Sequence, residues 1–309
     1  MTTLGFMKQT GFLSFLAAVL AAGGCGGSGG GASTGALSLR ITDGAVDSAE
    51  HVFVQFSGLE LQGAGQRITL FYCQDPMDAA NTVVGDTACT TPPAPKQLDL
   101  LALSGGQADF LLDGFTLAAG HYEWVRLAVD TAGTLDSYIV RNGNHELTIP
   151  SGMETGLKVN RGFDVPAGGS ADFTLDFDLR KSVLVTGTGQ YLLRPTLRMV
   201  NNVMVGAISG TVEASLVPGG CTPAVYVFQG AGVTPEDIDG TPADPLSVAS
   251  VTLDANDNVY KYRAAFLEAG DYTLTYTCDA DDPMVDEVLA FSGTTTVSVA
   301  AGANTVQDF

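Results

Sequence analysis

The sequence predicts an all-β protein that is built from two antiparallel β-sandwiches. Apolar and polar residues alternate along many short segments that are rich in β-branched residues, and clusters of Gly, Pro, Asn and Asp recur about every ten residues. Beyond the N-terminal segment, no stretch keeps the apolar period of a helix for three turns. Short strands with turns at this spacing are typical of sandwiches or barrels.

Composition narrows the possible functions. The chain has 309 residues, a formal net charge of −20 and 45% apolar residues, which is too apolar for a disordered chain. A pI near 4.2 argues against a nucleic-acid partner, because phosphates would be repelled. One tryptophan and three histidines leave little material for imidazole-based metal or acid–base chemistry.

Residues 1–24 are predicted to be an export signal. Lys8 precedes an apolar run over residues 12–20, which is too short to span a bilayer, and small residues lead to Cys25. The segment resembles a bacterial lipoprotein signal, with Ala22 where that pattern most often has leucine. The resemblance implies that Cys25 is acylated, for example with palmitate, and becomes the mature N-terminus. The alternative is an ordinary secretory signal with an incidental cysteine.

Residues 25–35 are then expected to be the lipidated cysteine and a flexible Gly/Ser linker, because nothing in them can pack. Gly26 stands where aspartate would favour retention at the inner membrane, so the resemblance favours the outer membrane, on the periplasmic side or at the cell surface. No later segment is long and apolar enough to cross a bilayer as a helix.

The predicted strands follow the alternation in chain order. Their inward residues are Leu37, Leu39 and Ile41; Val52, Val54 and Phe56; Phe173, Leu175, Phe177 and Leu179; Val225 and Val227; Val251 and Leu253; and Leu274 and Tyr276. We expect one domain over 36–205, with a net charge of −8, and a more acidic one over 206–309, with a net charge of −13.

A short internal echo relates the two predicted domains. Leu117–Tyr122 matches Leu267–Tyr272, and each motif leads into an alternating strand. In both, glycine suits a turn with positive φ, and the tyrosine hydroxyl can reach the backbone. Duplication of a sandwich and convergent turn chemistry both account for the echo.

Four cysteines remain if Cys25 carries lipid. In an exported protein, an even count indicates disulfides, and four cysteines allow three pairings. Proximity in the sequence favours Cys73–Cys89 and Cys221–Cys278, one bridge in each domain. A metal site is the competing interpretation, but none of the four lies in a C-x-x-C pair.

Several ordered segments of the first domain resemble a known bacterial family. They are Leu37–Asp43, Val52–Phe56, Leu98–Leu103, Tyr122–Leu127, Ile149–Gly152, Gly156–Lys158, Leu175–Val183 and Tyr191–Pro195. Together, over roughly residues 36–200, they resemble the domain-of-unknown-function family 4382. The resemblance implies an exported, β-rich and commonly lipid-anchored domain, and it supplies no activity.

The second domain more loosely resembles a transthyretin-like or carboxypeptidase-regulatory-like sandwich. The matching segments are Gly206–Val212, Asp254–Tyr260 and Leu267–Tyr272, although Asp257 and Asn258 stand where that pattern usually has glycine. Such modules are mostly accessory and seldom catalytic, which is what the resemblance implies here.

Signals of catalysis are weak. The sequence has no Gly-x-Ser-x-Gly motif, and His145-Glu146 continues without the second histidine of a zinc protease. A hydrolase would require His51, His121 or His145 to meet a nucleophile. We therefore expect no enzyme, and an uncharacterised hydrolase is the alternative.

Clustered oxygen ligands raise the question of calcium. Asp254, Asn256 and Asp257 concentrate hard oxygen ligands in one turn, and the loop over 279–287 is also acidic. Neither segment has EF-hand spacing, and Asp and Asn populate turns because their side chains bond to the local backbone. Turn chemistry is favoured over a calcium site, and no other cofactor is expected. Asp172, Asp176 and Asp178 are expected on a solvated sheet face, partly neutralised by Arg180 and Lys181.

The function that these patterns favour is a lipid-anchored, non-catalytic binding or structural module with a protein partner. A carbohydrate-binding module is the alternative. Its conceivable stacking residues are Tyr72, Trp124, Tyr138 and Tyr260.

Overall fold

The computed structural model describes residues 33–43, 49–63, 65–75, 82–85, 89, 91–131, 133–150 and 156–309. The predicted signal over 1–24, Cys25 and most of the linker lie outside the described residues. The first strand begins at Thr34, so the end of the predicted linker belongs to a strand. Gly35 is required there, because a Cβ atom would lie 2.2 Å from the carbonyl oxygen of Pro166.

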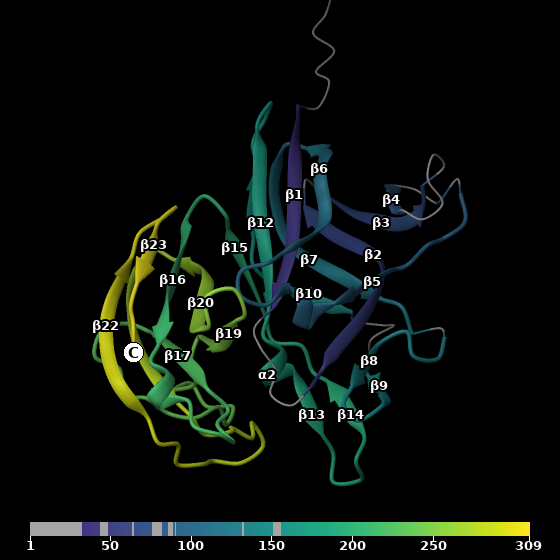
Figure 1. The fold of residues 1–309 in the computed structure, drawn as a ribbon. Helices are drawn as coiled ribbons and strands as arrows, with labels where there is room; N and C mark the ends of the chain where they lie inside the picture. Colours follow the sequence, from purple (N-terminus) through teal and green to yellow (C-terminus); the bar gives the residue numbers. More distant parts are fainter. Residues whose placement is uncertain are drawn as a thin grey trace, which may run out of the picture. The chain divides into compact units, whose positions relative to one another are not determined.

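The described chain is nearly all β, as predicted (Figure 1). The strands before residue 203 are β1 (Thr34–Asp43), β2 (His51–Gly63), β3 (Gln66–Gln74), β4 (Thr82–Gly85), β5 (Lys96–Asp99), β6 (Asp109–Ala118), β7 (Gly120–Val129), β8 (Tyr138–Val140), β9 (Asn144–Thr148), β10 (Leu157–Val159), β11 (Phe163–Val165), β12 (Ser170–Phe177), β13 (Val183–Val185), β14 (Tyr191–Leu193) and β15 (Leu197–Asn201). A 3₁₀ turn η1 (Leu100–Leu103) and a single-turn helix α2 (Leu179–Ser182) interrupt them.

The later strands are β16 (Val205–Val212), β17 (Ala224–Gln229), β18 (Ser247–Ser250), β19 (Thr252–Asp254), β20 (Val259–Glu268), β21 (Gly270–Thr277), β22 (Ser292–Val299) and β23 (Asn304–Val306), with a 3₁₀ turn η2 (Ala214–Leu216). Among the described residues, no helix is long and apolar enough to cross a membrane.

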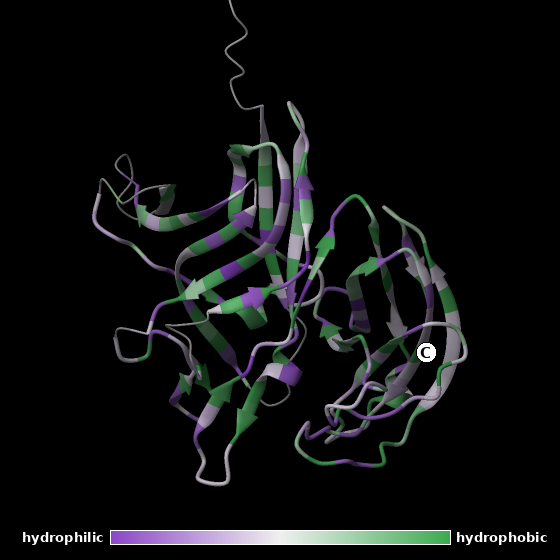
Figure 2. Cartoon of the chain, turned by 180° about the vertical axis from the view of Figure 1, so that it is seen from behind, coloured by the Kyte–Doolittle hydropathy of each residue, from purple (hydrophilic) through white to green (hydrophobic). Residues whose placement is uncertain are grey.

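Two stacked sheets enclose the first core. One sheet has the order β15-β12-β1-β6, and the other runs β10-β7-β2-β8-β9-β14-β13, with β3, β4, β5 and β11 attached beside this path. The predicted inward residues lie between them. Leu37, Leu39 and Ile41 of β1 are at most 1% exposed, and Val52 and Val54 of β2 are fully buried. Figure 2 displays this alternation as bands of hydrophobic and hydrophilic colour along the strands.

A second pair of sheets encloses a separate core. Their orders are β19-β20-β16-β23 and β18-β17-β21-β22. The core includes Ile208 and Tyr262 from the first of these sheets and Val225, Val227 and Leu274 from the second. The strands before and after residue 203 share no sheet, although residues 33–309 form one compact unit by their contacts. The division into domains at 205/206 stays a prediction.

The sequence echo extends to the strand pairing. β1 pairs in parallel with β12 and antiparallel with β6, and β16 pairs in parallel with β23 and antiparallel with β20. Each hairpin that follows carries an echoed tyrosine. The Tyr122 hydroxyl donates to the carbonyl of Ala118 at 2.9 Å, and the Tyr272 hydroxyl donates to the carbonyl of Glu268 at 2.7 Å. Repeated topology and repeated chemistry together favour duplication. Gly120 has a positive φ, whereas Gly270 does not, so that part of the prediction is wrong.

Three strand predictions are corrected by the structure. Leu253 was predicted to face inward, but it lies on the edge strand β19 and is 48% exposed. β12 ends at Phe177, so Leu179 and Arg180 lie in α2 and not on a strand. In β21, both faces are buried, because Thr273 and Thr275 are 0% exposed alongside Leu274. Their hydroxyls donate to the carbonyls of Gly230 and Ser292, which satisfies these polar groups inside the protein.

Candidate functional site

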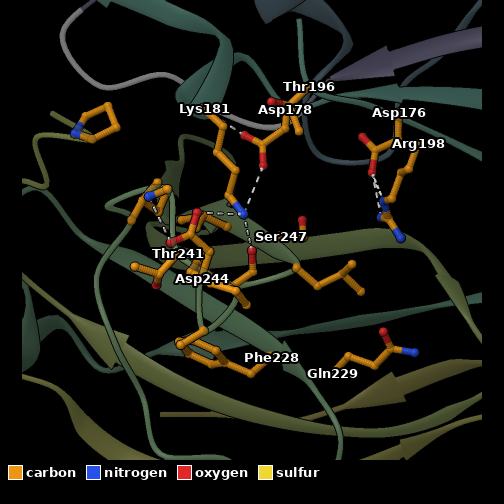
Figure 3. A pocket seen from close by; sticks show the side chains of 18 of the residues that line it. Asp176, Asp178, Lys181, Thr196, Arg198, Phe228, Gln229, Thr241, Asp244 and Ser247 are labelled. Carbon is orange, nitrogen blue, oxygen red and sulfur yellow. Dashed lines mark hydrogen bonds and ion pairs between the residues drawn. The ribbon is translucent and has the colours of Figure 1, made fainter. Parts of the chain in front are cut away.

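A cleft of about 700 Å³ lies where α2 and β15 face the segment between β17 and β18 (Figure 3). We call it the cleft and define it by Asp176, Asp178, Lys181 and Arg198 on one side and residues 240–248 on the other. A concave site with convergent polar groups is where a ligand is expected first.

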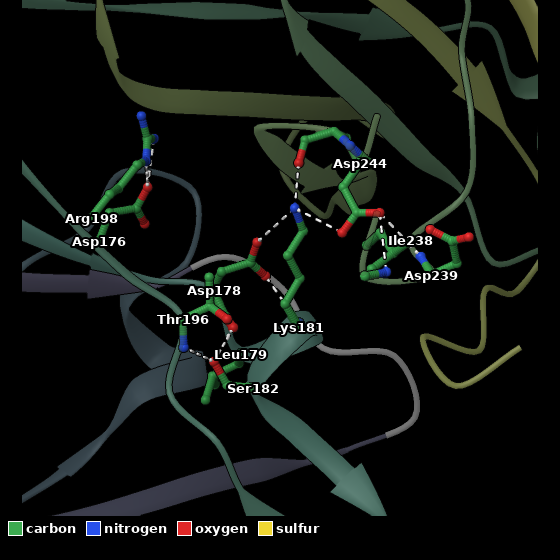
Figure 4. Close-up of polar contacts among 12 residues, drawn as sticks. Asp176, Asp178, Leu179, Lys181, Ser182, Thr196, Arg198, Ile238, Asp239 and Asp244 are labelled. Carbon is green, nitrogen blue, oxygen red and sulfur yellow. Dashed lines mark hydrogen bonds and ion pairs between the residues drawn. The ribbon is translucent and has the colours of Figure 1, made fainter. Parts of the chain in front are cut away.

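The backbone of α2 positions Lys181. Asp178 precedes the helix, and its Oδ1 accepts the backbone N–H of Lys181 at 3.2 Å, which caps the first turn. The Ser182 hydroxyl donates to the carbonyl of Asp178 at 2.5 Å and accepts the N–H of Thr196 at 2.8 Å (Figure 4). The turn is therefore tied to the approach to β15, and its lysine is directed towards the cleft.

Three oxygens surround the Lys181 ammonium. It donates to the carbonyl of Pro245 at 2.7 Å and lies 3.3 Å from Asp244 Oδ2 and 3.9 Å from Asp178 Oδ2. Asp244 Oδ1 accepts the backbone N–H groups of Asp239 and Gly240, both at 3.2 Å. One lysine therefore holds the loop over 239–245 against α2.

The remaining charges of the cleft are also paired. Arg198 Nε donates to Asp176 Oδ2 at 2.6 Å. Burial raises the pKa of the Asp178 carboxyl, and the neighbouring Lys181 opposes that shift. Asp176 and Asp178 were predicted on a solvated sheet face, but both line the cleft. Asp176 is paired across the sheet with Arg198, and Asp172 with Arg40 at 2.6 Å.

This arrangement does not prepare a nucleophile. A catalytic lysine is a desolvated amine without an anion beside it, whereas Lys181 has carboxylates on two sides. Within the described ranges, no hydrogen bond joins a histidine to a serine, threonine or cysteine. His51 pairs with Asp99 at 2.6 Å, His121 pairs with Asp164 at 3.0 Å, and His145 contacts the carbonyl of Arg141 at 3.0 Å.

The four aromatic residues proposed for sugar stacking do not form one groove. Tyr72 is 3% exposed, and its hydroxyl donates to the carbonyl of Leu111. Tyr138 stacks on Phe53 with ring centroids 4.7 Å apart, and Tyr260 lies in β20, in a different sheet. Trp124 is partly exposed on β7, among cationic side chains.

The predicted calcium ligands are held by a lysine. The Lys261 ammonium donates to Asp254 Oδ2 at 2.8 Å and also to Asp257 Oδ2. Asp254 Oδ1 accepts the backbone and side-chain N–H groups of Asn256, both at 2.9 Å. In the described part of the chain, no group of three or more His, Cys, Asp or Glu residues is placed to hold a metal ion. This turn therefore uses its carboxylates for local bonds, and the calcium site stays a prediction.

Both predicted disulfides are present in the structure. They join Cys73 to Cys89 and Cys221 to Cys278. The first bridge lies before residue 203 and the second after it. The second bridge ties the turn before β17 to the end of β21.

Sequence reasoning missed a buried polar chain beside a second pocket of about 670 Å³. Arg180 Nη1 donates to the Tyr226 hydroxyl at 2.8 Å, and that hydroxyl donates to Asp281 Oδ2 at 2.6 Å. Arg180 and Asp281 are 5% and 7% exposed. Arg180 was expected on the surface, and no local pattern distinguishes it from the neighbouring Lys181.

Comparison with models of protein families identifies the family of this chain. The model of the family described as domain of unknown function (DUF4382) matches residues 34–195, which is more than half of the chain. The protein belongs to the DUF4382 family. The match begins with β1 and ends after β14, so this DUF4382 protein carries its family domain in the first pair of sheets. The sequence resemblance to this family is thereby confirmed.

Comparison with solved structures and curated proteins adds little to the family. A leucine-rich repeat protein from Bacteroides thetaiotaomicron aligns at 13% identity and a TM-score of 0.20 over 90% of this chain and 26% of its own. The Bacillus anthracis TIE protein aligns at 10% identity with a TM-score of 0.20, over 90% of this chain and 50% of its own. A minor pilin of Streptococcus agalactiae aligns at 11% identity with a TM-score of 0.19, over 88% of this chain and 94% of its own. The DUF4382 chain thus spans half or less of the first two. At these scores the similarities carry no argument about its function, and no curated protein matches it.

Proposed function

We propose that this DUF4382 protein is a lipid-anchored binding module of the bacterial envelope that holds its ligand without chemically changing it. The observation that carries the proposal is the pairing of the charges in the cleft. Lys181 is held by Asp244, Asp178 and a carbonyl, and Arg198 is held by Asp176. Charged groups that are already held by their neighbours favour recognition over reaction, because the amine and the guanidinium of the cleft are engaged by carboxylates.

The same pairing makes the cleft a preformed site. Asp244 and Lys181 fix the loop over 239–245, so little ordering of that loop is required when a ligand enters. Apolar surface from Val233, Ile238 and Leu246 lies beside the polar groups. A ligand with both apolar and hydrogen-bonding groups fits this lining.

Cleft binding is tested with a variant that fills the cleft. We would measure the melting temperature of the soluble protein from residue 33 onward with defined muropeptides and chitooligosaccharides as probes. At least one probe should raise the melting temperature of the wild type, and Val233→Trp should remove the rise. The matched control is Val306→Trp, which enlarges an exposed valine of β23 that does not line the cleft. A rise that survives Val233→Trp contradicts binding in the cleft.

The absence of catalysis needs its own assay. Chromogenic esters, glycosides and phosphate monoesters should not be turned over by the wild type above the rate of a buffer blank. Turnover that disappears in Lys181→Met would overturn the non-catalytic assignment.

The anchor rests on the sequence around Cys25 and is tested in cells. Metabolic labelling with an alkyne fatty acid should label the wild type and not Cys25→Ala, and the labelled protein should fractionate with the outer membrane. An unlabelled wild-type protein would contradict the lipid anchor and leave the cleft assays unaffected. The transthyretin-like assignment of residues 206–309 also rests on a sequence resemblance and remains a proposal.

A further inference from the structure

The only tryptophan of the chain lies in a group of cations on the outer face of the larger sheet. The Lys158 ammonium is 4.5 Å from the centroid of the Trp124 ring, and the guanidinium carbons of Arg67 and Arg126 are 5.4 and 5.9 Å from it. These distances are typical of cation–π contacts. We call these four residues the Trp124 patch.

The strand register explains why they meet. In one cross-strand row, Gln62 of β2 lies between Arg67 of β3 and Trp124 of β7. In the next row, Arg126 of β7 lies between Glu60 of β2 and Lys158 of β10. A register shift between β2 and β7 places one additional residue, Glu123, between Tyr122 and Trp124. This bulge lets Tyr122 point into the core while Trp124 and Arg126 share the outer face.

The charges of the patch are not explained by stability. Lys158 and Arg126 are direct cross-strand neighbours, and like charges in that position destabilise a sheet. Glu60 bonds to Arg126 and lies 3.7 Å from Arg67, whereas the exposed Lys158 has no ion pair among the described residues. Such a group of cations is unexpected in a chain with only 14 basic residues and a net charge of −20.

These observations point to a compact anion with an apolar face. A long polyphosphate or an anionic bilayer would meet the strongly negative remainder of the protein as well as the patch, whereas a small acidic ligand meets the patch alone. Same-face neighbours along β7 are roughly 7 Å apart and adjacent strands roughly 5 Å apart, so the ring and the cations cover an area of about one or two sugar residues. A hexuronate supplies both required features, a C–H face for an indole and a carboxylate for Lys and Arg.

We propose that the Trp124 patch binds an acidic saccharide through its carboxylates. Arg67 and Lys158 receive the anion, and Trp124 contacts the sugar ring. None of the three lines the cleft, so the inference goes beyond the proposed function and is tested independently of it.

The experiment uses Trp124 as its reporter. Because the chain has one tryptophan, its fluorescence reports on this patch alone. Titration of the soluble protein with trigalacturonate should change the emission and saturate, and maltotriose, a neutral trisaccharide, should not. Lys158→Gln should weaken binding about tenfold, as expected when one charge-assisted hydrogen bond is lost.

A matched control and four contrary outcomes complete the test. Arg194→Gln removes an exposed arginine away from the patch and should leave the affinity within about twofold of the wild type. Equal binding of maltotriose, or an affinity that Lys158→Gln leaves unchanged, would overturn the proposal. A response to oligothymidylate or phosphatidylglycerol vesicles but not to trigalacturonate would assign the patch to nucleic acid or membrane. No response to any probe would leave the patch without a ligand role, while the cleft assays would still stand.

Discussion

The guanidinium of Arg180 donates a hydrogen bond to the hydroxyl of Tyr226 at 2.8 Å, although the two residues belong to different sandwiches. Arg180 is 5% exposed and Tyr226 is fully buried. The same hydroxyl donates a hydrogen bond to Asp281 Oδ2 at 2.6 Å, so an arginine and an aspartate are connected through one phenol. A single oxygen atom therefore bridges two buried ionisable side chains and ties α2 to β17.

Removing the Tyr226 hydroxyl oxygen should lower the stability of the folded protein. Tyr226→Phe keeps the ring but leaves Arg180 and Asp281 each without one partner, and an unsatisfied buried group costs about 1–3 kcal/mol. We expect the free energy of unfolding in urea to fall by about 2 kcal/mol or more. Tyr191→Phe is the control, because that residue is only partly buried, and the change should alter stability by less than about 0.5 kcal/mol. Equal losses in both variants would contradict the shared role of the Tyr226 oxygen.

Asp281 should make stability depend on pH. Burial raises the pKa of its carboxyl, although hydrogen bonds from Tyr226 and Ile238 oppose the shift. The folded state therefore binds this proton more tightly than the unfolded chain. The resulting stabilisation is fully present below the unfolded pKa, about 3.9, and is lost as the pH rises through the folded pKa.

The variant Asp281→Asn measures that contribution, because an amide does not ionise. The free energy of unfolding of the wild type, minus that of the variant, should decrease as the pH rises from about 3.5 to 7. Urea unfolding at a series of pH values measures this difference. A difference that grows with pH would mean that the charged carboxylate is the form that the fold stabilises.

The local alternation predicted the buried face of most strands, with Leu253 on the edge strand β19 as an exception. Leu37, Leu39 and Ile41 are inside, because a period of two in a strand is set by backbone geometry alone. The same pattern could not reveal that Thr273 is also buried, since the other face of β21 is covered by residues distant in sequence. Two-sided burial is a property of tertiary packing.

The candidate sites were harder to predict for the same reason. Lys181 and Asp244 are far apart in sequence, and only the packing of α2 against the β17–β18 segment brings them together. Around Trp124, a β-bulge and the register of four strands decide which cations meet the ring. The cysteines were predictable because their proximity in sequence and the exported setting limited the pairings.

The turn around Lys261 gives a prediction at single-residue level. A hydrogen bond from Lys261 and others from Asn256 lower the pKa of Asp254 to about 2. Lys261→Gln should therefore raise the pKa of Asp254 towards the ordinary aspartate value, which a carboxyl-carbon NMR titration measures. The lowered pKa contributes stability above the unfolded value that is lost as the pH falls through about 2. An unchanged Asp254 pKa in the variant would show that Lys261 is not its partner in solution.

The same lysine sets the expected response to calcium. Its ammonium contacts both Asp254 and Asp257, so it competes with a cation for these oxygens. Millimolar calcium should leave the melting temperature of the wild type unchanged. A calcium-dependent rise that Asp257→Asn abolishes would instead establish the calcium site.

The two disulfides should differ in their contribution to stability. The Cys73–Cys89 bridge closes a separation of 16 residues and the Cys221–Cys278 bridge one of 57. If the bridges act by restricting the unfolded chain, the shorter loop contributes about 3 kcal/mol and the longer about 4 kcal/mol. Urea unfolding of the paired serine variants, Cys73→Ser with Cys89→Ser and Cys221→Ser with Cys278→Ser, measures both losses.

Because the second bridge also fixes the end of β21 next to Asp281, its removal should add a loss of contacts in the folded state to the entropic one. A larger loss in the variant without the Cys73–Cys89 bridge would contradict this ranking and show that native-state contacts around that bridge outweigh loop length.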